Sequence, residues 1–227
     1  MPTDTKAQIL DTAERLIAES GIDAVSLRTI TAEARVNLAA IHYHFGSKEA
    51  LVKEVFGRRV IPLNRQRLAL LDEAEARAGD GPLAVEDVLR TLFAPAIRLS
   101  RDPARGETFM RLCGRFYAEL GEYMQPMFEE LFKEVIERFM AAFRRACPEL
   151  PLKELFWRTH FAVGAMVHTM CDSERLKMIS QGVCDPSEVE GTIERMVRFT
   201  AAGLRAPVME APTREEEAMA SLLEGGR

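Results

Sequence analysis

The sequence predicts an all-α fold, and three observations support this prediction. Apolar residues recur at spacings of three and four along most of the 227 residues, as they do on one face of an α-helix. No run of alternating apolar and polar residues between turn signals indicates a β-strand. Residues that cap helices stand ahead of several of the periodic segments. We therefore expect a protein built from helices alone.

The first helix is expected to begin at Thr5, which forms a capping box with Gln8, and to end at Gly21. Three further caps are expected at Ser26, Asn37 and Ser47, whose side-chain oxygens can accept hydrogen bonds from the main chain of the helix that follows. A tight turn around Arg35 and Val36 separates the second helix from the third. The helices predicted after these caps span, in order, about 27–34, about 38–44, and a longer stretch that starts at Lys48.

Pro62 is expected to kink or interrupt this fourth helix, which then resumes to about Ala78. Residues 79–82, Gly-Asp-Gly-Pro, have the composition of a loop. The last helix has the strongest start signal, with Asp185 as its cap and Pro186 at its first position. The later helices are expected at about 84–100, with a kink at Pro95, and at about 106–119, 122–146, 152–171 and 186–204.

These elements predict two domains and a tail. Residues 1–55 form a small helical domain, and residues 56–205 form a larger helical one. Residues 206–227 are charged and contain two prolines and a Gly-Gly pair, so we expect a flexible tail in which Thr213 and Glu216 could begin one short helix.

Composition excludes some classes of protein. Hydrophobic residues make up 47% of the chain and charged residues 29%, and no stretch of about 20 residues is free of charge, so we expect no membrane span. The four cysteines lie far apart in a chain too long to depend on disulfides, which agrees with a reducing compartment. The first ten residues lack the pattern of a secretory signal. We expect a cytoplasmic protein.

Charge is unevenly distributed along the chain. The net charge is −5, but residues 1–60 hold eight Lys or Arg and eight Asp or Glu, so the whole excess of negative charge lies in residues 61–227. Between Arg28 and Lys53 the chain holds four basic residues and two acidic ones. A locally basic end on an acidic body would orient the protein on DNA.

Residues 26–45 have the layout of a helix-turn-helix, with a capped short helix, a tight turn and a second capped short helix. In the second helix, Ile41 and Phe45 lie four residues apart and are expected to face inward with Val36. The outer face could then reach the groove and phosphates of DNA. From patterning and charge alone, however, the same hairpin could belong to an ordinary helical bundle. The residues expected on the outer face are Leu38, Ala39, His42 and Tyr43.

Residues 5–55 resemble the DNA-binding domain of the TetR family of bacterial transcriptional regulators. The most specific part of the resemblance is Val36-Asn37-Leu38-Ala39-Ala40-Ile41-His42-Tyr43-His44-Phe45-Gly46-Ser47-Lys48-Glu49-Ala50-Leu51. It combines a turn, a recognition helix with an aromatic pair, a Phe, and a Ser-Lys-Glu-x-Leu sequence that opens the next helix. Helix one, with Ile9-Leu10-Asp11-Thr12-Ala13 and Glu19-Ser20-Gly21, is similar to the family pattern as well.

The resemblance implies a role for individual residues. Lys48 matches a lysine that holds a phosphate together with the main-chain amides at the start of the fourth helix. Arg35 departs from the pattern, because the family often has glycine there. The residues that match DNA-contacting positions are Arg28, Thr29, Asn37, Leu38, Ala39, His42, Tyr43, His44 and Lys48.

The resemblance also implies a larger domain that dimerises and encloses a small apolar ligand, whose binding releases the protein from its pseudo-palindromic operator. Residues 36–40 are similar to those of the subgroup that responds to fatty acids or acyl-coenzyme A. The middle helices are rich in Phe and Met, as suits an adaptable pocket, although such residues also build ordinary cores. The expected ligand-binding residues are Phe93, Phe109, Cys113, Phe116, Tyr117 and Phe128. The expected dimer contacts are Phe161, Gly164, Ala165, His168, Ile193 and Val197.

Other functional classes find less support in the sequence. The chain contains no Gly-x-Ser-x-Gly elbow and no glycine-rich phosphate loop, so we do not expect an enzyme. His168 and Cys171 share a helical face, but two ligands make a poor metal site, and we expect neither a metal nor a cofactor. A helical carrier or adaptor that binds lipids without binding DNA is the alternative.

Overall fold

The computed structural model describes residues 5–118, 124–171 and 173–208, and these residues form helices without any β-strand. The prediction of an all-α fold is therefore confirmed. The helices are α1 (Thr5–Ser20), α2 (Leu27–Glu33), α3 (Leu38–Phe45), α4 (Lys48–Ala78), α5 (Val85–Ser100), α6 (Gly106–Ala118), α7 (Met124–Ala146), α8 (Leu152–Cys171), α9 (Ser173–Ile179) and α10 (Val189–Arg205).

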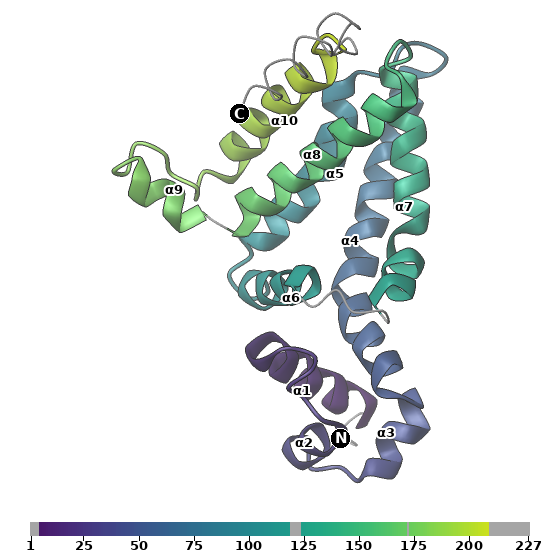
Figure 1. Ribbon diagram of the computed structural model, residues 1–227, viewed down its shortest axis with the longest axis vertical. Helices are drawn as coiled ribbons and strands as arrows, with labels where there is room; N and C mark the ends of the chain where they lie inside the picture. Colours follow the sequence, from purple (N-terminus) through teal and green to yellow (C-terminus); the bar gives the residue numbers. More distant parts are fainter. Residues whose placement is uncertain (1–4, 119–123, 172, 209–227) are drawn as a thin grey trace, which may run out of the picture.

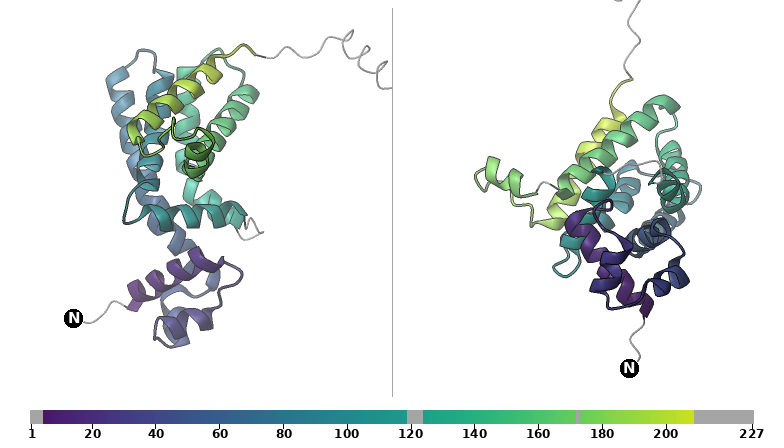
Figure 2. Two further views of the ribbon diagram at one scale, coloured as in Figure 1. Left: turned by 90° about the vertical axis from the view of Figure 1, so that its left-hand side faces the viewer. Right: turned by 60° about the horizontal axis from the view of Figure 1, so that its bottom comes forward.

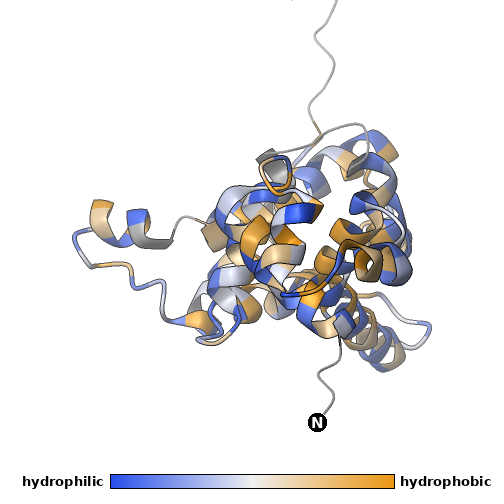
Figure 3. Ribbon diagram, turned by 90° about the horizontal axis from the view of Figure 1, so that it is seen from below, coloured by the Kyte–Doolittle hydropathy of each residue, from blue (hydrophilic) through white to orange (hydrophobic). Residues whose placement is uncertain are grey.

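Two groups of helices are joined by α4. At one end of the molecule, α1, α2 and α3 form a small unit together with the start of α4 (Figure 1). From there α4 runs into a bundle with α5, α7, α8 and α10, and α6 lies crosswise between α1 and this bundle (Figure 2). Hydrophobic and hydrophilic stretches alternate along the helices, as expected where each buries one face (Figure 3).

The caps predicted at Ser26, Asn37 and Ser47 are confirmed, whereas Gln8, the expected capping-box partner of Thr5, donates its side-chain amide to the main-chain oxygen of Ala34 at 2.8 Å. Ser26 Oγ accepts a hydrogen bond from the main-chain N–H of Thr29 at 3.0 Å, and Asn37 Oδ1 accepts one from Ala40 at 2.8 Å. Ser47 Oγ accepts one from the N–H of Ala50 at 3.2 Å. Each side chain satisfies a main-chain donor that has no partner within its own helix, so short helices can begin at defined residues.

The turn between α2 and α3 depends on an uncommon backbone conformation. Arg35 has a φ of 50°, in the left-handed region that glycine occupies at little cost. The N–H of Val36 donates to the carbonyl of Thr31 at 3.0 Å, which closes the turn. Arginine at this position therefore keeps the tight geometry of the turn, at a conformational cost of about 1 kcal/mol that glycine would not carry.

Pro62 does not interrupt α4, so of the two outcomes predicted for it, a kink or an interruption, the interruption is wrong. The helix is continuous from Lys48 to Ala78 because tertiary contacts hold its central part in place. Asn64 Nδ2 donates to the main-chain oxygen of Leu131 on α7 at 2.9 Å, and Arg67 Nε donates to that of Leu92 on α5 at the same distance. The proposed domain boundary at residue 55 consequently falls inside one helix.

Helices of the larger domain contribute to the core of the N-terminal domain. The core of the N-terminal domain contains Ile9, Ile17 and Ile41, and it is completed by Leu112 of α6 and Met127 of α7. Leu112 and Met127 expose only 2% and 6% of their surface. A change in the position of α6 or α7 must therefore repack the N-terminal core, because cores tolerate few voids.

The segment between α8 and α10 differs from the sequence prediction. Asp185 Oδ1 accepts a hydrogen bond from the N–H of Ser187 at 2.9 Å and so stabilises a turn, and α10 begins only at Val189. The short helix α9, which the sequence did not indicate, projects away from the bundle (Figure 1). The helix expected at Thr213 lies outside the described residues.

No helix among the described residues combines the length and the apolar character needed to cross a membrane.

Candidate DNA interface and ligand cavity

The outer face of α3 is open to solvent. Ile41 and Phe45, exposed by 0% and 8%, point into the core as predicted, whereas Tyr43 is 85% exposed and does not pack against α1. Leu38 is 40% exposed, and Ala39 beside it is exposed as well. This face presents a small residue, an aliphatic group and a phenol, which together suit close approach to a DNA groove.

The polar residues of α3 have different structural roles. Asn37 is engaged in capping, since its side-chain oxygen already accepts from Ala40. His42 Nδ1 lies 3.1 Å from the carbonyl oxygen of Gly46, so this ring secures the end of α3 while remaining exposed. His44 is half-buried, with its ring centroid 5.1 Å from that of Tyr43 in an edge-on arrangement. His42 is therefore better placed than His44 to reach DNA.

Two helix N-termini flank α3. Arg28 and Thr29 are exposed in the first turn of α2, and Lys48 is the first residue of α4. Hydrogen bonds from its own main chain and from Ser47 hold the pKa of Glu49 below its usual value. The start of α4 thus favours negative charge, as a phosphate-binding position requires.

A buried carboxylate connects α1 to α4. Glu14 is only 4% exposed and accepts from Arg59 Nη2 at 2.6 Å and from Arg59 Nε at 2.7 Å. Arg58 contributes a second, longer contact of 3.4 Å to the same carboxylate and pairs with Asp11 at 2.7 Å. These ion pairs hold the first helix of the N-terminal domain against the helix that continues into the bundle.

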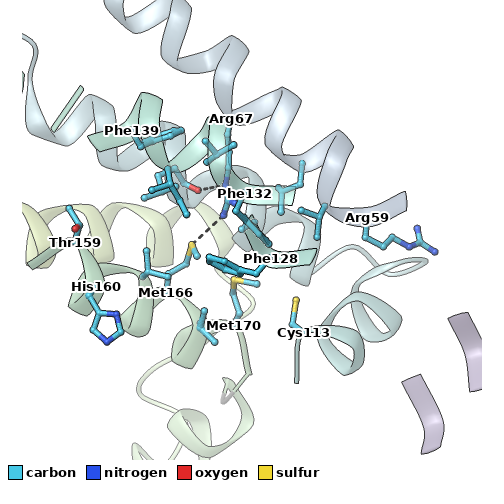
Figure 4. A pocket seen from close by; sticks show the side chains of 18 of the residues that line it. Arg59, Arg67, Cys113, Phe128, Phe132, Phe139, Thr159, His160, Met166 and Met170 are labelled. Carbon is cyan, nitrogen blue, oxygen red and sulfur yellow. Dashed lines mark hydrogen bonds between the residues drawn. The ribbon is translucent and has the colours of Figure 1, made fainter. Parts of the chain in front are cut away.

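The bundle encloses a cavity of about 380 Å³ between α4, α5, α6, α7 and α8 (Figure 4). Its volume falls within the range of small-molecule sites. Phe128, Ile136 and Phe156 line it and are 36%, 40% and 54% exposed, so the cavity opens to solvent between α7 and α8. Seven phenylalanines and four methionines contribute to the lining: Phe56, Phe109, Phe128, Phe132, Phe139, Phe143, Phe156, Met110, Met140, Met166 and Met170.

The structure sorts the expected ligand-binding residues into three groups. Phe109, Cys113 and Phe128 line the cavity. Phe93 does not line it; this side chain is 0% exposed in the core of the bundle, because α5 turns it away from the cavity. The side chains of Phe116 and Tyr117 lie outside what the structure describes.

Cys113 lines the cavity, and its thiol is not reactive. Burial raises the pKa of Cys113 to about 12, although the positive charge of Arg67 acts in the opposite direction. At neutral pH the thiol stays protonated, and a protonated thiol is a poor nucleophile and metal ligand. Among the described residues, no three His, Cys, Asp or Glu side chains are grouped so as to hold a metal ion.

Arg59 and Arg67 of α4, and His160 of α8, also line the cavity, and sequence reasoning did not identify them. Isolated charged residues on a long helix are normally solvated, so nothing in the local pattern marked them. The apolar neighbours of Arg67 along α4, Leu63 and Leu71, gave the only available signal, because they place Arg67 on the buried face.

The expected dimer contacts fall into two groups, exposed or half-buried residues on α8 and buried residues on α10. On α8, Phe161 is 61% exposed, Gly164 and His168 are exposed, and Ala165 is half-buried, so these residues lie on or beside an outer face.

On α10, Ile193 and Val197 expose only 2% and 0% of their surface. The expectation that they contact a partner is corrected: both fill the core of their own chain, where α10 packs on α5. Phe199, 76% exposed, lies on the outer face of α10 instead.

Comparison with known proteins gives two family matches. Residues 9–55 match a family described as bacterial regulatory proteins, tetR family, and residues 90–203 match one described as tetracyclin repressor-like, C-terminal domain. Over 72 residues the chain is 35% identical to the HTH-type nicotine-responsive transcriptional repressor HdnoR of Paenarthrobacter nicotinovorans. This match covers 32% of the chain and spans 37% of the length of that relative.

Solved structures show the same fold at low sequence identity. The fatty acid degradation regulator FadR of Bacillus halodurans superposes with a TM-score of 0.58 at 15% identity, covering 91% of this chain and 100% of that one. The complex of SmeT with triclosan gives a TM-score of 0.58 at 17% identity, covering 92% and 99%. With its helix-turn-helix and its helical C-terminal domain both matched, this chain belongs to the TetR family of bacterial regulatory proteins.

Proposed function

We propose that this TetR-family regulator is a dimeric repressor, which binds operator DNA through α3 and leaves it when a small apolar ligand enters the cavity. The observation that carries this proposal is that one helix, α4, begins at Lys48, three residues after the end of α3, and then forms a wall of the cavity. The similarity to a nicotine-responsive repressor and to SmeT, which was solved as a complex with triclosan, supports a ligand-responsive regulator.

The contribution of α6 and α7 to the N-terminal core provides a route from the cavity to the helices proposed to bind DNA. Leu112 of α6 lines the cavity and also belongs to the core of the N-terminal domain. A ligand that moves α4 or α6 therefore acts on the packing of α1 and α3. A coupling free energy of about 1–3 kcal/mol would weaken operator binding by about 5- to 150-fold, and operator DNA would weaken ligand binding by the same factor.

An acyl chain is the ligand that we propose for this cavity, supplied as a fatty acid or as its coenzyme A ester. Phenylalanine and methionine dominate the lining, and flexible thioethers adapt to a chain with many conformers. The fold similarity to a fatty acid degradation regulator agrees with this choice. The binding of such a ligand needs no catalytic group, which favours a regulator over an enzyme.

The direct test is to sequence genomic DNA fragments retained by the purified full-length protein, and then to measure binding to the enriched duplex with and without fatty acids. We expect one enriched pseudo-palindromic site whose complex is weakened by the ligand. Failure to retain any duplex at low salt, with ligand binding intact, would favour the helical carrier. Turnover of an acyl substrate would favour an enzyme.

The role of Lys48 leads to a first prediction. Lys48→Ala is expected to weaken binding to all duplexes by a similar factor and to lower the slope of log affinity against log salt by about one, because the ammonium contacts a phosphate. Leu38→Ala or Tyr43→Ala, on the exposed face of α3, should instead change which half-site sequence is preferred. Titrations at several salt concentrations measure both effects. An unchanged salt slope in Lys48→Ala would contradict the proposed contact between Lys48 and a phosphate.

We propose that the outer faces of α8 and α10 form the dimer interface. Trp157, Phe161 and Phe199 expose 51%, 61% and 76% of their surface there, and large exposed apolar groups of this kind mark protein contacts. Two recognition helices must reach half-sites about 34–36 Å apart, which requires a dimer.

Gly164 provides the test of this interface. A side chain added at Gly164 meets open space in the isolated chain, so Gly164→Leu should fold normally, but it should keep two copies of α8 apart and leave a monomer with little operator affinity. Gly114 on α6 is an equally exposed helical glycine outside this face, so Gly114→Leu is the matched control and should remain dimeric. Sedimentation analysis distinguishes the monomer from the dimer. A dimeric Gly164→Leu protein would show that the interface lies elsewhere.

A further inference from the structure

The hydrogen bond of His42 determines the role of each of its two ring nitrogens. Nδ1 lies 3.1 Å from the main-chain carbonyl oxygen of Gly46, just beyond the end of α3. A carbonyl oxygen can only accept a hydrogen bond, so Nδ1 must be the donor and must carry a hydrogen. In the neutral ring the second nitrogen, Nε2, then carries no hydrogen and is an acceptor.

The Nε2 atom of His42 is left for a partner outside the chain. The two nitrogens lie at different edges of the ring, so Nε2 cannot reach the carbonyl that Nδ1 contacts. His42 is exposed, and within residues 5–118, 124–171 and 173–208 its ring makes no second hydrogen bond. Leu38 and Ala39, one turn earlier on the same face, are exposed as well. The acceptor therefore belongs to the outer face of α3, at the end of the molecule away from the bundle (Figure 1).

The other polar groups expected to contact DNA offer different chemistry. Arg28 and Lys48 carry donors and no acceptor, so they suit phosphates and guanine. The side-chain oxygen of Asn37 is occupied by the cap of α3. The hydroxyl of Tyr43 can rotate and either donate or accept, so it does not discriminate between the two kinds of partner. On the outer face of α3, His42 is the residue that presents an acceptor fixed by a second contact.

A fixed acceptor distinguishes bases by their amino groups. In the major groove, cytosine presents its N4 amino group and adenine its N6 amino group as donors. Guanine O6 and thymine O4 are acceptors at the corresponding places. An acceptor held against either oxygen is repelled, and both groups lose the hydrogen bond that water supplied.

We propose that His42 is a specificity-determining residue, whose neutral ring accepts a hydrogen bond through Nε2 from the amino group of a cytosine or an adenine. This inference rests on the proposed binding of α3 to operator DNA and adds the chemical group that is read there. Since the proposed dimer has two copies of α3, the contact is expected once in each half-site.

The test places N4-methylcytosine or N6-methyladenine in the duplex that the full-length protein enriches from genomic DNA. The methyl group replaces the amino hydrogen that faces the major groove and keeps the Watson–Crick pair, so it removes one donor at a time. Each cytosine and adenine is modified in turn, symmetrically in both half-sites, and binding is measured at pH 8, above the usual titration range of histidine. At one position we expect methylation to weaken wild-type binding by about 10- to 100-fold, because one hydrogen bond is lost in each half-site.

Variants of His42 assign the methyl-sensitive position to this residue. His42→Ala should bind the unmodified duplex more weakly by a similar factor and should no longer respond to methylation at that position. His42→Arg carries only donors, so it should prefer guanine there. His44→Ala is the matched control, because His44 is half-buried and packs its ring against Tyr43 at 5.1 Å. This control variant should keep the wild-type response to methylation.

Three results would overturn the inference. The first is a wild-type protein that responds to no amino methylation in the half-site, and this measurement does not depend on any variant folding. The second is an equal response in wild-type protein and folded His42→Ala, which would assign the contact to another residue. The third is a His42→Ala protein that loses affinity evenly for all duplexes and lowers the salt slope by about one, as loss of a phosphate contact does.

The failure of this inference differs from the failure of the proposed function. If no duplex is retained at low salt, DNA binding by α3 is wrong, and the role of His42 falls with it. If Leu38→Ala changes the preferred half-site but His42→Ala does not, DNA binding by α3 stands and only the contact with an amino group is lost.

Discussion

Replacement of Phe93 by alanine is expected to lower the free energy of unfolding by about 3–5 kcal/mol. Phe93 is 0% exposed on α5 and belongs to the main core of the bundle, so truncation removes a whole aromatic ring from a site without access to solvent. Because Phe93 does not line the cavity, the affinity for a ligand should change little under conditions where the variant is folded. Urea unfolding, at one fixed protomer concentration because a dimer is expected, measures the loss.

Phe128→Ala is the matched control for Phe93→Ala. Phe128 stacks on Phe132 at 4.9 Å between ring centroids, but it lies at the cavity opening and is 36% exposed. Its truncation should cost only about 1 kcal/mol of stability while it weakens ligand binding. If the two variants lost equal stability, or if Phe93→Ala changed ligand affinity more than Phe128→Ala, the assignment of Phe93 to the core and Phe128 to the cavity would be contradicted.

Replacement of Glu14 by alanine should have the second-largest effect, a loss of about 2–3 kcal/mol. The carboxylate is 4% exposed, and its removal leaves two arginine side chains at the α1–α4 contact without this shared partner. Breaking a fully buried ion pair costs about 3–5 kcal/mol. The side chains of Arg58 and Arg59 are 35% and 26% exposed, so their hydration offsets part of this cost. Thermal and urea unfolding measure the change.

Glu33→Ala is the control for Glu14→Ala. Glu33 pairs with Arg15 at 3.0 Å, also between two helices of the N-terminal domain, but both side chains are about half exposed. Exposed pairs of this kind contribute about 0–1 kcal/mol. Glu14→Ala should also weaken operator binding, since α1 would no longer be held on α4, although Glu14 is not on the face proposed for DNA. A stability loss in Glu14→Ala no larger than that in Glu33→Ala would show that burial of Glu14 contributes nothing.

The sequence by itself determined the local features of the N-terminal domain. The caps at Ser26, Asn37 and Ser47 depend on hydrogen bonds within three residues, so their residue types are sufficient to predict them. The spacing of Ile41 and Phe45 likewise determines which face of α3 remains exposed. The resemblance to the TetR family rested on this same short segment, and the family matches confirm it.

The tertiary structure alone decided how the larger domain uses its apolar residues. Phe93 and Phe109 are the same residue type on neighbouring helices, and only the packing of those helices turns one into the core and the other toward the cavity. Packing also decided the role of Ile193 and Val197, which are buried within their own chain. Apolar spacing shows that a helix has a buried face, but it does not show whether the same chain or a partner covers that face. Arg67 is the strongest case, since a charged residue is normally solvated, and only contacts with helices distant in the sequence place it inside the cavity.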